Sequence, residues 1–553
     1  MKRVWGWIKE NSGSILLMIF VGYIRFSAIK WGLPNEHHNF SYHPDEFLTA
    51  LPAYKMIANS DWNPHIYNYP SLYYYLTSFV GTLALGFGVK PTLTNIYLFP
   101  RIVTAILSIV SLPAIYWAAR QYFNKISAGM AAFLLFLTPV IVLHSRFATV
   151  DVPSMFFVII SVGFAGKAYK EGNTKYFIWA GVFAGLAAGT RYQAGFVILS
   201  TIAAGLMLSK TLLKDKLLKI SLAVLATVIV FIITTPGVIL DYQHFITAIK
   251  YEMNHAKIGH GLVFAGTGNG LLYILTNNLR FALGWVIYLS FAIALYVSYR
   301  KKERQVLVLL AFIMPYIILI SFSQVRFVRY LIPIIPAILI ITSSILIDTR
   351  KEFSFRNIFV TVILSFLFVM PSMDLFISIT RKDIHEYRDS SAEHIINLEI
   401  PLKGIAVMDV PWFYSIPLSK DIGFGSLPER REALKESKIP IKVMLDYNKP
   451  EDWFKNNKPD LVIVSDYEIS DAYRLRNNNN ISSEDRAQVS KILANMDFVQ
   501  KNYRLDDQYK KLYEYESSKM DFVTYTLFGS PAKDIPHDMK YTLPTIYIYK
   551  LKK

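Results

Sequence analysis

The sequence predicts a polytopic α-helical membrane protein with about eleven transmembrane helices, followed by a soluble α/β domain. Three observations predict this architecture. Of the 553 residues, 53% are hydrophobic and 15% aromatic, and the mean hydropathy is +0.32. Long apolar segments alternate with short, basic loops up to residue 378, whereas the remainder is polar. We therefore divide the chain into a membrane domain, 1–378, and a soluble domain, 379–553.

The composition also excludes some classes of protein. The net charge of +17 could indicate a nucleic-acid partner, but much of the basic charge lies in short loops between apolar segments, as in a membrane protein. The chain has no cysteine. A disulfide framework, a thiol nucleophile and a cysteine metal site are therefore excluded.

The apolar segments predict the transmembrane helices. A helix needs about 20 mostly apolar residues to cross the hydrocarbon core. No small-residue cleavage site follows the first apolar run, so we interpret it as a retained helix and not as a signal peptide. Residues 71–88 are apolar but short, and we predict an interfacial or re-entrant helix there. The eleven predicted spans are 13–32, 99–119, 126–144, 152–168, 176–189, 193–209, 219–236, 279–298, 306–323, 330–347 and 357–378.

The basic residues predict the orientation of these helices. Lys and Arg are concentrated in alternate loops, for example in Arg300-Lys301-Lys302-Glu303-Arg304. The positive-inside rule places these loops, and with them the N-terminus, in the cytoplasm. An odd number of spans then places the soluble domain outside the cell membrane.

The soluble domain contains short apolar runs that alternate with helical patterns, and this predicts an α/β domain. Residues 474–480 (RLRNNNN) predict a loop. The predicted strands are 405–409, 441–445, 460–464 and 545–549, and the predicted helices are 383–398 and 483–496.

The candidate catalytic carboxylates lie in two of the predicted outer loops. Asp45 and Glu46 follow His43-Pro44 in the first outer loop, and Asp151 lies in the second. A carboxylate there can act as a general base toward a hydroxyl group. The alternative is structural, because acidic residues in the first turn of a helix and Asp at a helix N-cap are common.

Basic and imidazole side chains lie in the same predicted outer loops. Arginine can bind a phosphate through two hydrogen bonds, and one base with such a cationic clamp would suffice for glycosyl transfer from a lipid phosphate. The alternatives are arginines that extend to the membrane interface and ordinary loop histidines. The candidate phosphate-binding and substrate-binding residues are Arg146, Arg191, Arg326, Arg329, His255 and His260.

Four segments, in this order, resemble a known family. They are HPDEFLTALPAYKMIANSDWNPHIYNYPSLYYYL (43–76), RFATVDVPSMFF (146–157), GTRYQAGF (189–196) and QVRFVRYLIPIIPAIL (324–339). Together they resemble the GT-C glycosyltransferases of the protein O-mannosyltransferase and lipid A aminoarabinose transferase type. The resemblance covers about residues 10–350.

The resemblance implies a polyprenyl- or dolichyl-phosphate sugar donor, and a lipid, glycan or protein hydroxyl as acceptor on the outer face. It implies Asp45 as the base, Glu46 as its acidic neighbour and Asp151 as a second carboxylate. Aminoarabinose transferases carry Glu-Lys-Pro where this chain has Asn68-Tyr69-Pro70. Tyr69 thus replaces the Lys that would meet the donor phosphate, and we include Tyr69 among the candidate binding residues.

Three functions compete at this point. An inverting transferase of a single sugar explains the polar residues gathered on one face, whereas a lipid-linked sugar flippase would place polar groups near mid-membrane and on both faces. A membrane scaffold would leave the outer acids and arginines unexplained. We predict a donor with one phosphate and assign no metal ligand, although the histidines leave room for a divalent ion.

Overall fold

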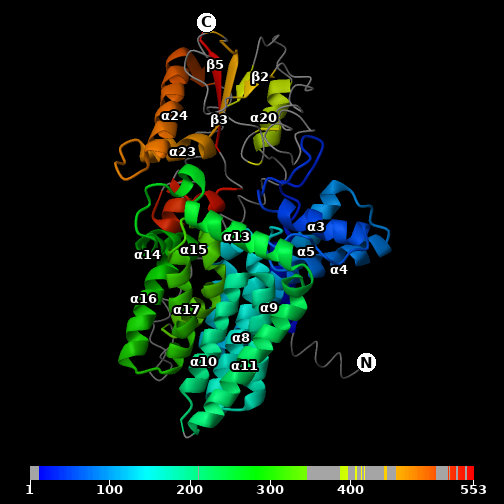
Figure 1. Cartoon of the computed structure of the whole chain (residues 1–553). Coiled ribbons are helices and arrows are strands. Elements are labelled where there is room, and N and C mark those ends of the chain that lie inside the picture. The colour runs from blue at the N-terminus through cyan, green and yellow to red at the C-terminus, as the bar shows by residue number, and fades with distance from the viewer. Residues whose placement is uncertain are drawn as a thin grey trace.

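The computed structural model describes residues 12–209, 211–345, 387–396, 405–407, 441–444, 458–505, 523–530, 534–541 and 545–552, with short pieces at 413, 416–417, 456 and 521. Figure 1 shows a bundle of helices with a small sheet beyond one end, and the C-terminus lies at the sheet. Most of the described residues are helical, as predicted for the larger part of the chain.

Several helices between residues 12 and 345 begin within two residues of a predicted span, whereas others, such as Phe47–Ala58 and Tyr242–Ile258, match none. The helices are α2 (Ser12–Phe26), α3 (Phe47–Ala58), α4 (Leu72–Gly86), α5 (Leu93–Ala119), α6 (Lys125–Leu137), α7 (Pro139–His144), α8 (Asp151–Glu171), α9 (Thr174–Thr190), η1 (Tyr192–Val197), α10 (Ile198–Leu206), α11 (Leu213–Thr234), α12 (Gly237–Leu240), α13 (Tyr242–Ile258), η2 (Gly261–Phe264), α14 (Gly270–Tyr273), η3 (Ile274–Asn278), α15 (Leu279–Leu283), α16 (Trp285–Arg300), α17 (Gln305–Ser321), η4 (Val328–Ile334) and α18 (Ile335–Ser343).

The structure supports a membrane protein but does not confirm the predicted number of spans. Among the described residues, three helices are long and apolar enough to cross a membrane: α5, α8 and α11. A bent pair, Gly270–Leu283 with Trp285–Arg300, could form a fourth span. The predicted span 357–378 lies outside the described residues, and eleven spans remain a prediction.

Two predicted spans are not continuous helices. The segment 126–144 breaks between α6 and α7, where Thr138 adopts an extended conformation (ψ 121°) before Pro139. A residue before proline avoids the helical region for steric reasons. The segment 279–298 bends by 117° at Gly284, whose φ of 77° suits a residue without a side chain. The predicted span 279–298 is therefore not one straight helix, since the helix Trp285–Arg300 begins after the bend.

Small residues let α8, α9 and α11 pack closely, and this packing positions part of the site. A Cβ atom at Gly181 of α9 would lie 2.1 Å from the carbonyl oxygen of Ala223 in α11. Such close approach of backbones is typical of membrane helices. Because α9 follows α8 after a short turn, the end of α9 returns to the beginning of α8. Asp151 and Arg191 therefore come to the same end of the bundle.

The described part of 387–552 forms a mixed sheet with helices, as the alternating pattern predicted. The strand order is β2-β1-β3-β5-β4, with β1 parallel to β2 and β3, and β5 antiparallel to β3 and β4. The elements are α20 (Tyr387–Ile396), β1 (Ile405–Val407), β2 (Ile441–Met444), β3 (Leu461–Ser465), α23 (Asp466–Leu475), α24 (Ser483–Asn502), β4 (Tyr503–Leu505), η6 (His537–Met539) and β5 (Ile546–Leu551).

Candidate active site

Asp45 and Arg329 form an ion pair at the end of the bundle that faces the sheet. Arg329 Nη2 donates to Asp45 Oδ2 at 2.7 Å. Asp45 lies just before α3, and Arg329 lies at the beginning of η4, so two predicted outer loops that are far apart in sequence meet here. The Asp45 side chain is 22% exposed and the Arg329 side chain 7%. Asp45 is therefore within reach of a substrate.

The C-terminal part of the chain completes this ion pair. The hydroxyl group of Tyr541 accepts a hydrogen bond from Arg329 Nη1 at 2.7 Å. The carboxylate of Asp538 accepts from the backbone N–H of Arg329 at 2.8 Å. Both Asp538 and Tyr541 are buried. These contacts fix the guanidinium group of Arg329 beside Asp45.

Asp151 and Arg191 form a second ion pair nearby. Arg191 Nη1 donates to Asp151 Oδ1, and the two side chains are only 7% and 3% exposed. Asp151 is the first residue of α8, where the helix dipole favours a negative charge. Because both charges are buried, each depends on the other for compensation.

Two tyrosines, Tyr330 and Tyr69, lie near the two ion pairs. The guanidinium carbon of Arg191 lies 4.8 Å from the ring centroid of Tyr330, and that of Arg329 lies 5.8 Å from it. Burial, and after it the charge of Asp45, raises the pKa of Tyr69 well above its ordinary value. The phenol of Tyr69 therefore stays protonated and can donate a hydrogen bond at this site.

Glu46 lies next to Asp45, but its side chain is enclosed by the protein and paired with an arginine. Its side chain is fully buried, and Arg101 donates to both carboxylate oxygens, at 2.7 and 2.6 Å. The backbone N–H of Ala148 donates to Oε1 at 2.6 Å, and the hydroxyl group of Ser41 donates to Oε2. These contacts argue against the predicted catalytic role of Glu46. Glu46 instead holds the loop that carries Asp45 against α5 and the second outer loop.

The guanidinium group of Arg146 is also held in place, by hydrogen bonds to the backbone. Its guanidinium group donates to the carbonyl oxygens of Ser27 at 2.9 Å, Val142 at 2.8 Å and Ile24 at 3.3 Å. The residue is 1% exposed. A phosphate could reach it only by displacing these bonds, so the structure argues against the predicted phosphate-binding role.

Arg326, like Arg146 and unlike its neighbour Arg329, is held by hydrogen bonds within the protein. Arg326 Nη1 donates to Thr267 Oγ1 at 2.6 Å and to the carbonyl oxygen of Gly268 at 2.9 Å. Its Nε donates to the carbonyl oxygen of Ser323 at 3.1 Å. Arg326 thus fastens the segment before α14 to the loop after α17, which argues against its predicted role in phosphate binding.

The two predicted histidines flank the site. The ring centroids of His255 and His260 lie 5.4 Å apart, and the His260 ring lies 5.5 Å from that of Phe327. Partial burial and then His255 lower the pKa of His260, and the charges of Arg329 and Asp45 also act on it. His260 therefore lies at the edge of the Asp45 cluster, whereas His255 is one step further out.

A comparison with known protein families finds a match to part of the chain. The family model described as dolichyl-phosphate-mannose-protein mannosyltransferase matches residues 92–239, about a quarter of the chain. The matched segment contains Arg101, Asp151 and Arg191. No curated protein matches the chain.

A solved structure shows that the fold is shared. The crystal structure of ArnT from Cupriavidus metallidurans, bound to undecaprenyl phosphate, is 14% identical, with a TM-score of 0.51 over 82% of this chain and 93% of ArnT. The chain has the fold of ArnT, a GT-C glycosyltransferase. A second similar structure is the archaeal oligosaccharyltransferase AglB from Archaeoglobus fulgidus, in complex with an inhibitory peptide and a dolichol-phosphate. It is 13% identical, with a TM-score of 0.47 over 99% of this chain and 89% of AglB.

Several residues of this site were not anticipated from the sequence. Arg101 is an ionised residue inside an apolar span, and that alone marks a candidate for special function. Tyr330 follows Arg329 directly, but an isolated tyrosine gives no comparable signal. Asp538 and Tyr541 lie some 200 residues from Arg329, and their local sequence gives no sign of this contact.

Proposed function

We propose that the protein transfers a single sugar from a polyprenyl- or dolichyl-phosphate donor to a hydroxyl group, with inversion at the anomeric carbon. The observation that carries the proposal is the Asp45–Arg329 pair, which places a reachable carboxylate beside a fixed guanidinium group. Of the three carboxylates predicted to be catalytic, Asp45 is 22% exposed, Asp151 3% and Glu46 0%. Asp45 is therefore the best candidate for the base.

The proposed step is a direct displacement. The acceptor oxygen bonds to the anomeric carbon while the bond from that carbon to the phosphate oxygen breaks. Asp45 takes the acceptor proton, and Arg329 stabilises the charge of the departing phosphate. Attack opposite the leaving group inverts the anomeric configuration.

The Asp45–Arg329 ion pair predicts that the donor binds before Asp45 acts as the base. A guanidinium group has five N–H donors, and Arg329 places one nitrogen on Asp45 and another on Tyr541. A donor phosphate competes with Asp45 for the guanidinium group, because charge-assisted bonds to phosphate are equally strong. Binding of the donor therefore releases Asp45 toward the acceptor.

The membrane setting of the proposal follows from the sequence. We place the N-terminus in the cytoplasm and the site, with residues 379–553, on the outer face of the cell membrane, since the basic residues favour that orientation. The ArnT structure holds undecaprenyl phosphate, and this supports a lipid phosphate as donor. The acceptor in this proposal is a hydroxyl group of a lipid, glycan or protein.

The proposal is tested by transfer of labelled sugar in proteoliposomes. We expect transfer from a polyprenyl-phosphate sugar and none from an oligosaccharide on a polyprenyl diphosphate, because arginine matches a lone phosphate without a divalent ion. Activity should not require magnesium or manganese. Transfer only from the diphosphate donor, or complete loss in EDTA that magnesium or manganese restores, would contradict a monophosphate donor.

A second prediction concerns the phosphate. Arg329→Ala should weaken donor binding by about 10-fold or more, the loss expected for a hydrogen bond to a charged group. Arg326→Ala is the matched control from the same loop, because its guanidinium group is bound to Thr267 and Gly268. Arg191→Lys tests the second pair while keeping its charge. Unchanged donor affinity in both the Arg329 and the Arg191 variants would refute the clamp.

A further inference from the structure

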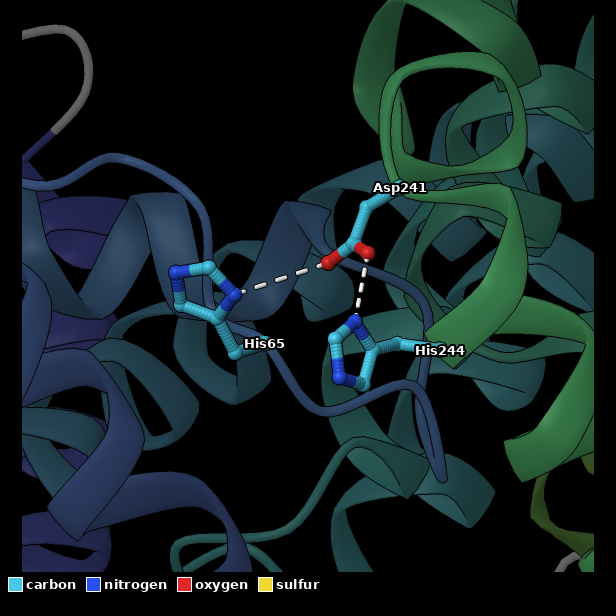
Figure 2. A group of neighbouring side chains, drawn as sticks. All are labelled: His65, Asp241 and His244. Atoms are coloured by element: carbon cyan, nitrogen blue, oxygen red, sulfur yellow. Dashed lines mark hydrogen bonds and ion pairs between the residues drawn. The ribbon is translucent and has the colours of Figure 1, made fainter.

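We propose that His65, Asp241 and His244 form a binding site for a Zn²⁺ ion. His65 lies in the loop between α3 and α4, Asp241 separates α12 from α13, and His244 lies in the first turn of α13. One coordinating atom from each residue lies within 4.8 Å of those of the other two. Figure 2 shows both imidazole rings turned toward the Asp241 carboxylate, each facing a different oxygen.

One of the two distances between the ligand atoms fits a tetrahedral zinc ion, and the other requires a small opening. Two ligands that are each about 2.0–2.1 Å from zinc stand roughly 3.3 Å apart. His65 Nδ1 lies 3.5 Å from Asp241 Oδ2, close to that separation and too long for an ordinary hydrogen bond. His244 Nδ1 lies 2.6 Å from Asp241 Oδ1, a hydrogen bond that zinc would replace after an opening of roughly 0.7 Å.

The hydrogen bond on the other side of the His65 ring favours a cation between His65 and Asp241. Its Nε2 lies 2.8 Å from Asp61 Oδ2, a good hydrogen-bond distance. A neutral imidazole has one N–H, and if it donates to Asp61, the lone pair of Nδ1 faces the Asp241 carboxylate. Two acceptors in that position need a cation between them, either a metal ion or a second ring proton. A carboxylate behind a metal-binding histidine is a common arrangement in zinc sites.

Neighbouring groups also hold the ligands in place. Asn63 Nδ2 donates to Asp241 Oδ2 at 2.8 Å, and the Tyr67 hydroxyl group lies 3.2 Å from the same oxygen. His65 has a φ of 52°, a left-handed conformation that is uncommon outside glycine. The orientation of the three ligands is thus largely set before an ion binds, which reduces the cost of ordering them.

The ligand types select the metal. Two imidazoles and one carboxylate suit zinc and similar transition ions, whereas magnesium and calcium prefer oxygen ligands. His65 and His244 are 56% and 65% exposed, so an ion can enter from solvent and keep a water molecule as its fourth ligand. None of the three residues matches the Glu-Lys-Pro positions of the aminoarabinose transferases.

The ion would fasten the loop before α4 to the beginning of α13. That loop already packs tightly, since a Cβ atom at Gly237 would lie 2.2 Å from the Tyr67 ring, and Tyr192 donates to the carbonyl oxygen of Tyr67 at 2.9 Å. Tyr69, two residues further, lies at the Asp45 cluster. Zinc would therefore help to position Tyr69, a consequence that rests on the proposed function, whereas zinc binding itself does not.

The test measures zinc directly, on full-length protein freed of any polyhistidine tag. After EDTA treatment, incubation with zinc and removal of free metal, we expect about one zinc per chain in the wild type and less than about a tenth of that in His65→Ala/His244→Ala and in Asp241→Asn. Gln243→Ala, an exposed neighbour on α13, is the matched control and should bind zinc fully. Zinc, but not magnesium, should raise the melting temperature of the wild type and the control only.

The variants remain informative because both histidines are exposed, and the metal-free proteins should melt at the same temperature. Equal zinc content in the wild type and the ligand variants, or no zinc in the wild type, would overturn the proposal. These outcomes are independent of sugar transfer, so failure of the zinc site and failure of the proposed function are distinguishable.

Discussion

Asp45→Asn is expected to lower the rate of sugar transfer by about 100-fold or more, the contribution typical of a positioned general base. Asparagine has the same shape and can still accept the hydrogen bond from Arg329 Nη2, but it cannot take a proton. Because the Asp45 side chain is 22% exposed, its neutralisation removes no deeply buried charge. Folding should therefore remain close to that of the wild type, and donor binding should be unchanged or tighter, since asparagine competes less than aspartate with the phosphate for Arg329.

The measurement is single-turnover transfer in proteoliposomes with the donor in excess. Donor binding and the melting temperature are measured on the same preparations. Asp215→Asn, an exposed aspartate in the first turn of α11, is the control for loss of one negative charge. A rate within a few-fold of the wild type would rule out Asp45 as the base. A rate that falls only together with donor affinity would instead indicate a role in binding.

Arg101→Ala is expected to destabilise the folded protein by about 3–5 kcal/mol, the cost of leaving one member of a buried ion pair without its partner. Arg101 donates to both oxygens of Glu46 and to the carbonyl oxygens of Ile29 and Trp31. Its removal therefore loosens the segments on both sides of Asp45. The melting temperature and the fraction of monodisperse protein in detergent report the loss.

Two further variants identify the cause. Arg120→Ala, at the exposed end of the same helix α5, should leave the melting temperature unchanged. The double variant Arg101→Met/Glu46→Leu should recover much of the stability, because an apolar pair of similar size removes both buried charges. A double variant as unstable as Arg101→Ala would show that the hydrogen bonds to the backbone, and not the charge on Glu46, dominate the effect.

The sequence predicted the helices well where apolar patterning is continuous. The predicted segment 219–236 corresponds to α11, Leu213–Thr234. The same pattern could not show the break before Pro139 or the bend at Gly284, because an average over an apolar segment does not register one backbone conformation. In the C-terminal part, β1, β2, β3 and β5 lie within one or two residues of the apolar runs that predicted them, whereas β4 was not predicted.

The sequence predicted which types of residue would form the site, but not which of these residues would bind each other. Positive charge is unusual in the predicted outer loops, and that singled out Arg326 and Arg329 together. Their different partners, backbone and Thr267 for Arg326 but Asp45 for Arg329, depend on packing between distant segments. For the same reason, the adjacent acids Asp45 and Glu46 have different partners, Arg329 and Arg101 respectively. Only the fold decides which of the two faces Arg101 in the interior.

The contacts of Asp538 and Tyr541 with Arg329 have a consequence for protein engineering. Residues 534–541 belong to the C-terminal part by sequence, but they support a residue of the helical bundle. A chimera that takes the C-terminal domain from a relative would replace these supports and disturb Arg329, even if both halves fold. The exchange should succeed only when the native segment 534–541 is kept with the bundle, so the functional boundary between the halves differs from the boundary in the sequence.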